Sequence, residues 1–286
     1  MKTSRKALSA TLLMILAACG SKGFQGKSAE QAAGSKVDGS NANPITIPVL
    51  VDGRKVEDIL CTDGPTTMAS LNKVDFSEQF AAICTNGKTN ALFGQLLANA
   101  YSGSGEPQPQ VIKKKVGELY VTDISLAYAL KVPLENPTLF ADLKPHDVFS
   151  KGIAENNSNL TIKVTGRTPF PGKRSVEQVL LDYNLTNADG AGIYDKRKTE
   201  FNTYPLIENN RDITISAENL LEAESNDSYH QAQGLMIGIR AGDGSSYLIF
   251  VNQLVVKNRI DPDRMERTLL SLNKGAAKML MGLFKK

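Results

Sequence analysis

Hydrophobic and polar residues alternate along much of this 286-residue chain from residue 120 onward. One long run covers residues 120–132, and a period of two is typical of a strand in a half-buried sheet. Further runs predict strands at residues 160–165, 177–185, 193–204, 211–224, 229–241 and 246–257. The turn sequence at 242–245, Gly-Asp-Gly-Ser, accepts positive φ angles and predicts a hairpin. Strands joined in this way form an antiparallel meander.

The chain ends in a helical pattern. Asp261 is a suitable N-cap, and Pro262 fits the first turn. Apolar residues then recur at spacings of three and four, as one stripe: Met265, Leu269, Leu272, Ala276, Met279 and Leu283. Such a stripe serves either as core or as a surface for a membrane or partner. We predict that it packs on the meander, because the sheet needs a cover.

Residues 45–102 are predicted to form a small disulfide-bridged module. An apolar segment at 45–51 is a strand candidate, and helical patterns cover 77–83 and 89–100. A cluster of Gly, Ser and Pro then predicts a linker at 103–111, which separates the module from a larger domain at 112–286.

Cys61 and Cys84 are the only cysteines within this body of the chain. A metal site needs more ligands than this pair offers, and a redox pair normally has Cys-x-x-Cys spacing. We therefore predict a structural disulfide, as expected for a protein in an oxidising compartment.

The first residues predict export. Lys2, Arg5 and Lys6 precede an apolar run at 7–15, and Leu16-Ala17-Ala18-Cys19 closes it. This segment resembles the lipobox of bacterial lipoprotein precursors, and the alternative is an ordinary signal peptide with a chance cysteine. The resemblance implies a signal peptide at 1–18, diacylglycerol on the Cys19 sulfur, and acylation of the new amino terminus. Since Gly20 stands where Asp would favour the inner membrane, the resemblance further implies the outer membrane. Residues 20–44 have almost no large apolar side chain to bury, so residues 19–44 are predicted to form a flexible tether.

The mature chain would be neutral. The sequence holds 33 basic and 30 acidic residues, so loss of three basic residues with the signal leaves 33 − 3 = 30 of each. Nucleic acid is therefore not predicted as a partner. The one basic run in the body, Lys113-Lys114-Lys115, is interpreted as a solvated linker.

Motifs for catalysis are missing from the sequence. Gly103-Ser104-Gly105 lacks the spacing of a nucleophile elbow, and there is no HExxH, P-loop or GxGxxG. His146 beside Asp147 could act as a base, and so could His230, but an exposed surface position is the expected role of both. Asp261 and Asp263 suit helix capping better than cation binding. The protein is predicted to be non-enzymatic, with no catalytic residue, metal or cofactor.

The order of one long strand, a segment at 133–157, a meander and a terminal helix resembles the helix-grip fold of the START and Bet v 1-like superfamily. The resemblance covers about residues 112–286 and implies an α+β fold with a cavity for apolar ligands between sheet and helix. Pro145 interrupts the segment where the family has helices, so a lipocalin-like barrel with a terminal helix is the alternative.

Three functions follow from these observations. The first is a membrane-anchored envelope lipoprotein that binds a hydrophobic small molecule or lipid. The second is an envelope scaffold that docks proteins through residues 45–101. The third is an enzyme that uses His146 or His230.

Overall fold

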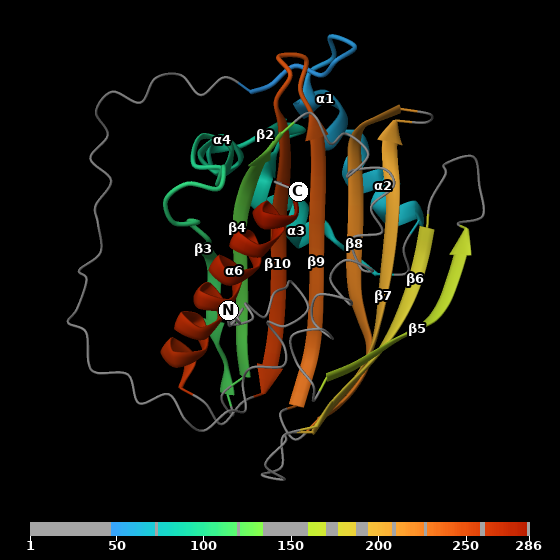
Figure 1. The fold of residues 1–286 in the computed structure, drawn as a ribbon, viewed down its shortest axis with the longest axis vertical. Coiled ribbons are helices and arrows are strands. Elements are labelled where there is room, and N and C mark those ends of the chain that lie inside the picture. The colour runs from blue at the N-terminus through green and yellow to red at the C-terminus, as the bar shows by residue number, and fades with distance from the viewer. Residues whose placement is uncertain are drawn as a thin grey trace, which may run out of the picture.

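The computed structural model describes residues 47–71, 74–118, 121–133, 160–169, 177–186, 194–207, 210–225, 228–257 and 261–284. Its main feature is an eight-stranded antiparallel sheet (Figure 1). The strands are β3 (Gln110–Val116), β4 (Val121–Val132), β5 (Leu160–Pro169), β6 (Glu177–Thr186), β7 (Tyr194–Ile207), β8 (Asn210–Ser225), β9 (Ser228–Arg240) and β10 (Ser246–Lys257).

The sheet is an open meander. Its order is β3-β4-β10-β9-β8-β7-β6-β5, so β3 and β5 form opposite edges and the described strands do not close into a barrel. The predicted α+β class with an antiparallel meander is confirmed, and the lipocalin-like alternative is wrong. The predicted long strand is β4, and the six strands of the meander are β5 to β10.

One strand was missed. The basic run interpreted as a linker lies in edge strand β3. Lysine is common at exposed sheet edges because it discourages edge-to-edge pairing. The interpretation as a solvated linker was therefore wrong.

Helix α6 (Pro262–Phe284) packs on one face of the sheet, in front of β3, β4 and β10 in Figure 1. Asp261 accepts a hydrogen bond from the backbone N–H of Asp263 through Oδ1, at 3.1 Å, which agrees with the predicted capping. Two apolar clusters fix the helix to β4 and β10, and they include the predicted stripe residues Met265 and Leu269. The predicted side chains Leu272 and Leu283 lie outside the described ones.

Four short helices cover the opposite face. They are α1 (Val56–Leu60), α2 (Asp63–Leu71), α3 (Ser77–Ile83) and α4 (Ala91–Ala98), with a small hairpin of β1 (Cys84–Thr85) and β2 (Lys88–Thr89). Helices α3 and α4 were predicted. The strand expected at 45–51 is wrong for its described part, because Val49 and Leu50 form only isolated bridges around a turn.

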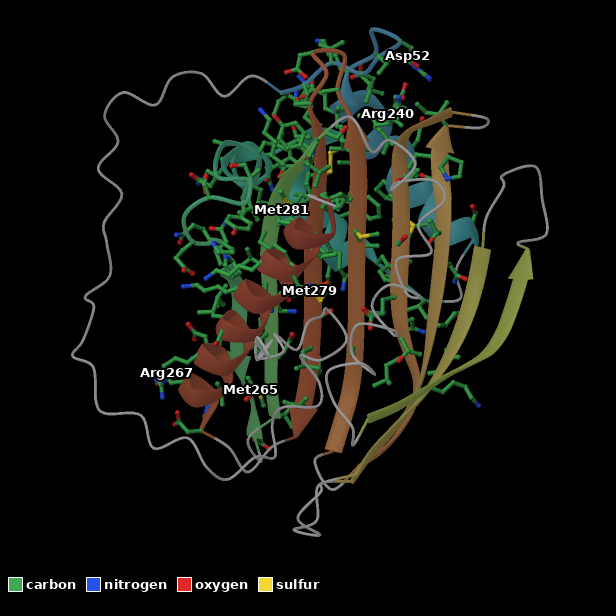
Figure 2. All side chains as sticks on the ribbon, in the orientation of Figure 1. Asp52, Arg240, Met265, Arg267, Met279 and Met281 are labelled. Atoms are coloured by element: carbon green, nitrogen blue, oxygen red, sulfur yellow. A yellow bond between two sulfur atoms is a disulfide. The ribbon has the colours of Figure 1, made fainter. Side chains whose placement is uncertain are left out.

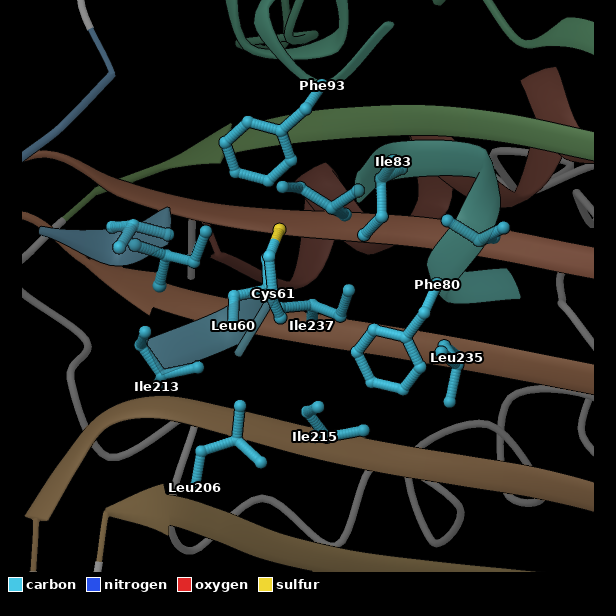
Figure 3. Packing of buried hydrophobic residues seen from close by; sticks show 14 of the residues in the cluster. Leu60, Cys61, Phe80, Ile83, Phe93, Leu206, Ile213, Ile215, Leu235 and Ile237 are labelled. Carbon is cyan, nitrogen blue, oxygen red and sulfur yellow. The ribbon is translucent and has the colours of Figure 1, made fainter. Parts of the chain in front are cut away.

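The Cys61–Cys84 disulfide is confirmed. It joins the end of α1 to β1, and its Cα atoms are 5.5 Å apart. Cys61 belongs to a core in which Phe80 and Phe93 from the helices pack with Ile215 and Ile237 from the sheet (Figure 3). The helical segment and the sheet thus share one core, and the division at 103–111 stays a prediction.

None of the described helices is long and apolar enough to cross a membrane. The segment predicted at 133–157 lies outside the described residues from 134 onward, and so do Cys19 and His146. His230 lies in β9, but its side chain is outside the described ones.

Candidate ligand-binding face

The face of the sheet that carries α6, hereafter the α6 side, changes in character from one strand to the next. Under α6, β4 and β10 present large apolar side chains, among them Leu126, Tyr128 and Phe250. On β9 the residues opposite β10 on this side include two glycines, Gly234 and Gly238. On β8 they are polar, and yet they are buried: Thr214, Ser216 and Glu218.

Buried polar atoms without hydrogen bonds gather on the α6 side. Nine described residues carry such an atom, and strand register and cluster membership place seven of them on this side. The seven are Thr122, Tyr128, Thr199, Arg240, Ser246, Asn252 and Asn273. The other two are Gln79 and Asn202. Since most buried polar groups in proteins are paired, such a concentration on one face calls for a physical reason.

Asn252 is at the centre of this group. It lies on β10 between Phe250 and Leu254, and neither atom of its amide has a partner. The amide lies over Gly234, where an added Cβ would be 2.7 Å from Asn252 Oδ1 and 3.5 Å from Glu218 Oε2. Glycine at this position therefore leaves room for both polar side chains on the α6 side.

Helix α6 places a second amide on the same side. Asn273 is fully buried; its Nδ2 donates to the Leu269 carbonyl at 2.8 Å, while its Oδ1 has no partner. Along α6, Asn273 separates Met265 and Leu269, which belong to one apolar cluster, from Ala277 and the residues that follow, which belong to the other. A polar position thus interrupts an otherwise apolar contact.

Tyr128 adds an aromatic hydroxyl. Its ring stacks on Phe250 with centroids 4.5 Å apart. Burial raises the pKa of Tyr128, so the hydroxyl stays neutral, and its oxygen has no hydrogen bond. A neutral hydroxyl can both donate and accept.

Ion pairs at or near the surface attach α6 at both ends. Lys114 on β3 pairs with Asp263 and, at 2.7 Å, with Glu266, whereas Lys278 pairs with Glu106 at 2.6 Å. The hydrogen bond from Lys114 lowers the pKa of Asp263. Since exposed pairs contribute at most about 1 kcal/mol each, the apolar clusters hold most of the helix in place.

On the opposite face, both ends of the Gln253 amide have partners. Gln253 donates to Glu78 Oε2 at 2.9 Å and Asp123 Oδ1 at 3.0 Å, and accepts from Gln79 at 3.1 Å. Lys113 bridges the same two carboxylates at 2.6 and 2.7 Å. Beside this network, a groove of about 410 Å³ is lined by Glu78, Gln79, Ala81, Ala82, Leu92, Ile112, Lys113, Lys115, Ser125, Val251 and Asn252.

Among the predicted site residues, the structure joins Cys61 and Cys84. They form a structural bridge in the core shared by sheet and helices, and Cys19 and His146 lie outside the described residues. Among the described residues, no three His, Cys, Asp or Glu side chains gather as metal ligands would. The polar residues of the α6 side were missed, although Asn252 visibly interrupts the apolar alternation Leu248, Phe250, Leu254.

No protein-family model and no curated protein matches the sequence. Three similar solved structures have the following sequence identities, coverages and TM-scores. A START superfamily protein from Mycobacterium smegmatis is 11% identical, with 56% of this chain and 97% of that chain covered and a TM-score of 0.33. The lipid transfer and protein localization domain of human StarD13 is 13% identical, with 68% and 97% covered and a TM-score of 0.38. Norcoclaurine synthase from Thalictrum flavum is 10% identical, with 60% and 96% covered and a TM-score of 0.31.

The similarity is to START-type structures. With TM-scores below 0.5 it carries no argument about function. The architecture described above rests on the strand order and helix packing of this chain.

Proposed function

We propose that the protein is an envelope lipoprotein, anchored in the outer membrane through Cys19, that binds a hydrophobic small molecule or lipid between its sheet and α6. The supporting observation is the gathering of unpaired, buried polar atoms among the apolar residues of the α6 side. Ligand sites are mostly apolar, with a few polar groups that fix orientation. This side has both.

The unpaired groups favour occupancy. A buried donor or acceptor without a partner costs about 1–3 kcal/mol, and a ligand that supplies the missing hydrogen bond recovers part of this cost. Because the unpaired atoms are themselves buried, a ligand reaches them only if α6 or its neighbours shift. The exposed pairs of Lys114 and Lys278 are weak enough to open and reform.

The anchor is tested by Cys19→Ser. Two or more acyl chains convert marginal into stable membrane attachment, so the variant is expected to leave the membrane fraction for the soluble fraction. Ser21→Ala, two residues further on, keeps the lipobox and should stay with the membranes. Membrane fractionation followed by mass analysis shows the location and acylation of both variants. Membrane retention of unacylated Cys19→Ser would overturn the proposal that Cys19 carries the anchor.

The cargo is tested by native mass spectrometry of the protein purified from its own membranes, followed by denaturing mass analysis. We expect a chain that begins at acylated Cys19 and carries an additional noncovalent apolar mass. The mass lost on denaturation identifies the class of ligand. An acylated chain with nothing bound in either state would contradict ligand binding.

The second candidate is an envelope scaffold. The observation in its favour is the groove between α3, α4, β3, β4 and β10, on the face away from α6. An empty, acylated protein in the experiment above would favour this function.

A further inference from the structure

The α6 side has a distinct polar end, where β9 passes into β10. Arg240, the last residue of β9, lies directly opposite Ser246, the first residue of β10. The next residues, Ile239 on β9 and Tyr247 on β10, pack in or against the core of the helical face, so Arg240 and Ser246 fall on the α6 side. Figure 2 shows Arg240 at this end of the sheet, far from Arg267 on α6.

Both residues have unused hydrogen-bonding groups. Ser246 is fully buried, and its Oγ has no partner. Arg240 Nε is buried and unpaired as well, but the side chain as a whole is 30% exposed. The side chain is therefore partly accessible from outside, while its Nε faces the protein.

The nearest charge does not saturate Arg240. Asp212 Oδ1 lies 3.7 Å from Arg240 Nη1, which is beyond hydrogen-bond distance. Within the described part of the chain, no hydrogen bond from Arg240 is found, although a guanidinium carries five N–H donors. This end of the face has a surplus of donors, so the group that fits it best is an acceptor.

Beyond this end, the strands become apolar for a defined length. On the α6 side, Ser246 is followed on β10 by Leu248 and Phe250, and their partners on β9 are Gly238 and Met236. The next pair is Asn252 and Gly234. At about 3.3 Å per residue, the polar end and Asn252 are about 20 Å apart. An acceptor group attached to a long apolar chain matches this order.

We propose that the ligand is an amphipathic acid whose carboxylate or phosphate is bound by Arg240 and Ser246, with its hydrocarbon chain lying along β9 next to α6. This rests on the proposed function. Arginine binds carboxylates and phosphates through two parallel hydrogen bonds, and an ionised acceptor forms the stronger kind of bond. Ser246 supplies a third donor from the neighbouring strand.

The test is calorimetric titration of the full-length protein, stripped of cargo, with dodecanoate, dodecyl phosphate and dodecan-1-ol. We expect the acids to bind at least tenfold more tightly than the alcohol. Arg240→Gln should lower the affinity for the acids at least tenfold and leave the affinity for the alcohol within twofold. Arg240→Lys keeps the charge but not the paired donors. Its affinity for the acids should lie between that of the original protein and that of Arg240→Gln.

The control is Arg267→Gln, which removes an exposed arginine from α6 and should change none of these affinities. The acid whose affinity falls more in Arg240→Gln, dodecanoate or dodecyl phosphate, identifies the head group as a carboxylate or a phosphate. Equal binding of acid and alcohol, or acid binding unchanged by Arg240→Gln, would overturn the inference and leave the proposed function intact. If no probe binds and the protein also carries no cargo from its membranes, the proposed function itself fails.

Discussion

Replacing Asn252 with Leu is expected to raise the free energy of unfolding by about 1–3 kcal/mol, because it removes a buried amide that has no partner. Leucine branches at the same atom as asparagine, and Gly234 opposite leaves space for it. The same substitution should reduce the cargo that copurifies with the protein, since the ligand loses a polar contact. Denaturant unfolding measures the first effect, and native mass spectrometry measures the second.

Gln253→Leu is the matched control. It changes the next residue of β10, which is also a buried amide but lies on the helical face, where it bonds to Glu78, Asp123 and Gln79. Two of these partners are charged, so the loss should lower the free energy of unfolding by about 3 kcal/mol. Opposite signs at adjacent positions would distinguish the two faces. Equal destabilisation by both variants would mean that Asn252 is already satisfied in the protein.

A gain in stability with a loss of binding is expected where side chains are kept for function. Asn252 and Asn273 are polar groups that oppose packing in an otherwise apolar contact, and such conflicts are expected at functional sites. Both residues lie among apolar neighbours that would accept Leu in their place. The presence of polar side chains in an apolar contact therefore identifies the α6 side as the candidate site more directly than the overall shape of the protein does.

Six strands of the meander and the terminal helix could be predicted because their patterns are long and periodic. A period of two over 12 residues, as in β4, leaves few alternatives. Strand β3 could not be predicted, because a polar edge strand buries little side-chain surface on either face. Within β3, Lys113 bonds to Glu78 of α3, and Lys114 bonds to Asp263 and Glu266 of α6. The lysine side chains of β3 alternate between the two faces of the sheet, but they form ion pairs there instead of packing in an apolar core.

The site was less predictable than the fold. The sequence contains Asn252 among apolar residues, yet its lack of a partner depends on strand register, which places Gly234 opposite it. Arg240 and Ser246 flank a hairpin whose turn was predicted, but the sequence does not indicate that Asp212 stops short of hydrogen-bond distance. Pairing between distant residues is a property of the folded chain.

Loss of the disulfide is expected to have the other large effect. In the chain-entropy model, a bridge across a separation of 23 residues contributes about 3 kcal/mol, so Cys61→Ala with Cys84→Ala should lower the free energy of unfolding by about that amount. Alanine avoids placing a hydroxyl in the core that Cys61 shares with Phe80 and Ile237. Urea unfolding of the double variant, and of the original protein with a reducing agent, should give the same value.

A loss below about 1 kcal/mol would mean that the shared core fixes α1 and β1 without the bridge. Binding provides a second readout, because the disulfide lies on the helical face of the sheet whereas Arg240 and Asn252 lie on the α6 side. At temperatures where the double variant remains folded, its affinity for dodecanoate should equal that of the original protein. A change in affinity would instead show that the two faces are coupled through the central strands, since β9 and β10 contribute side chains to both.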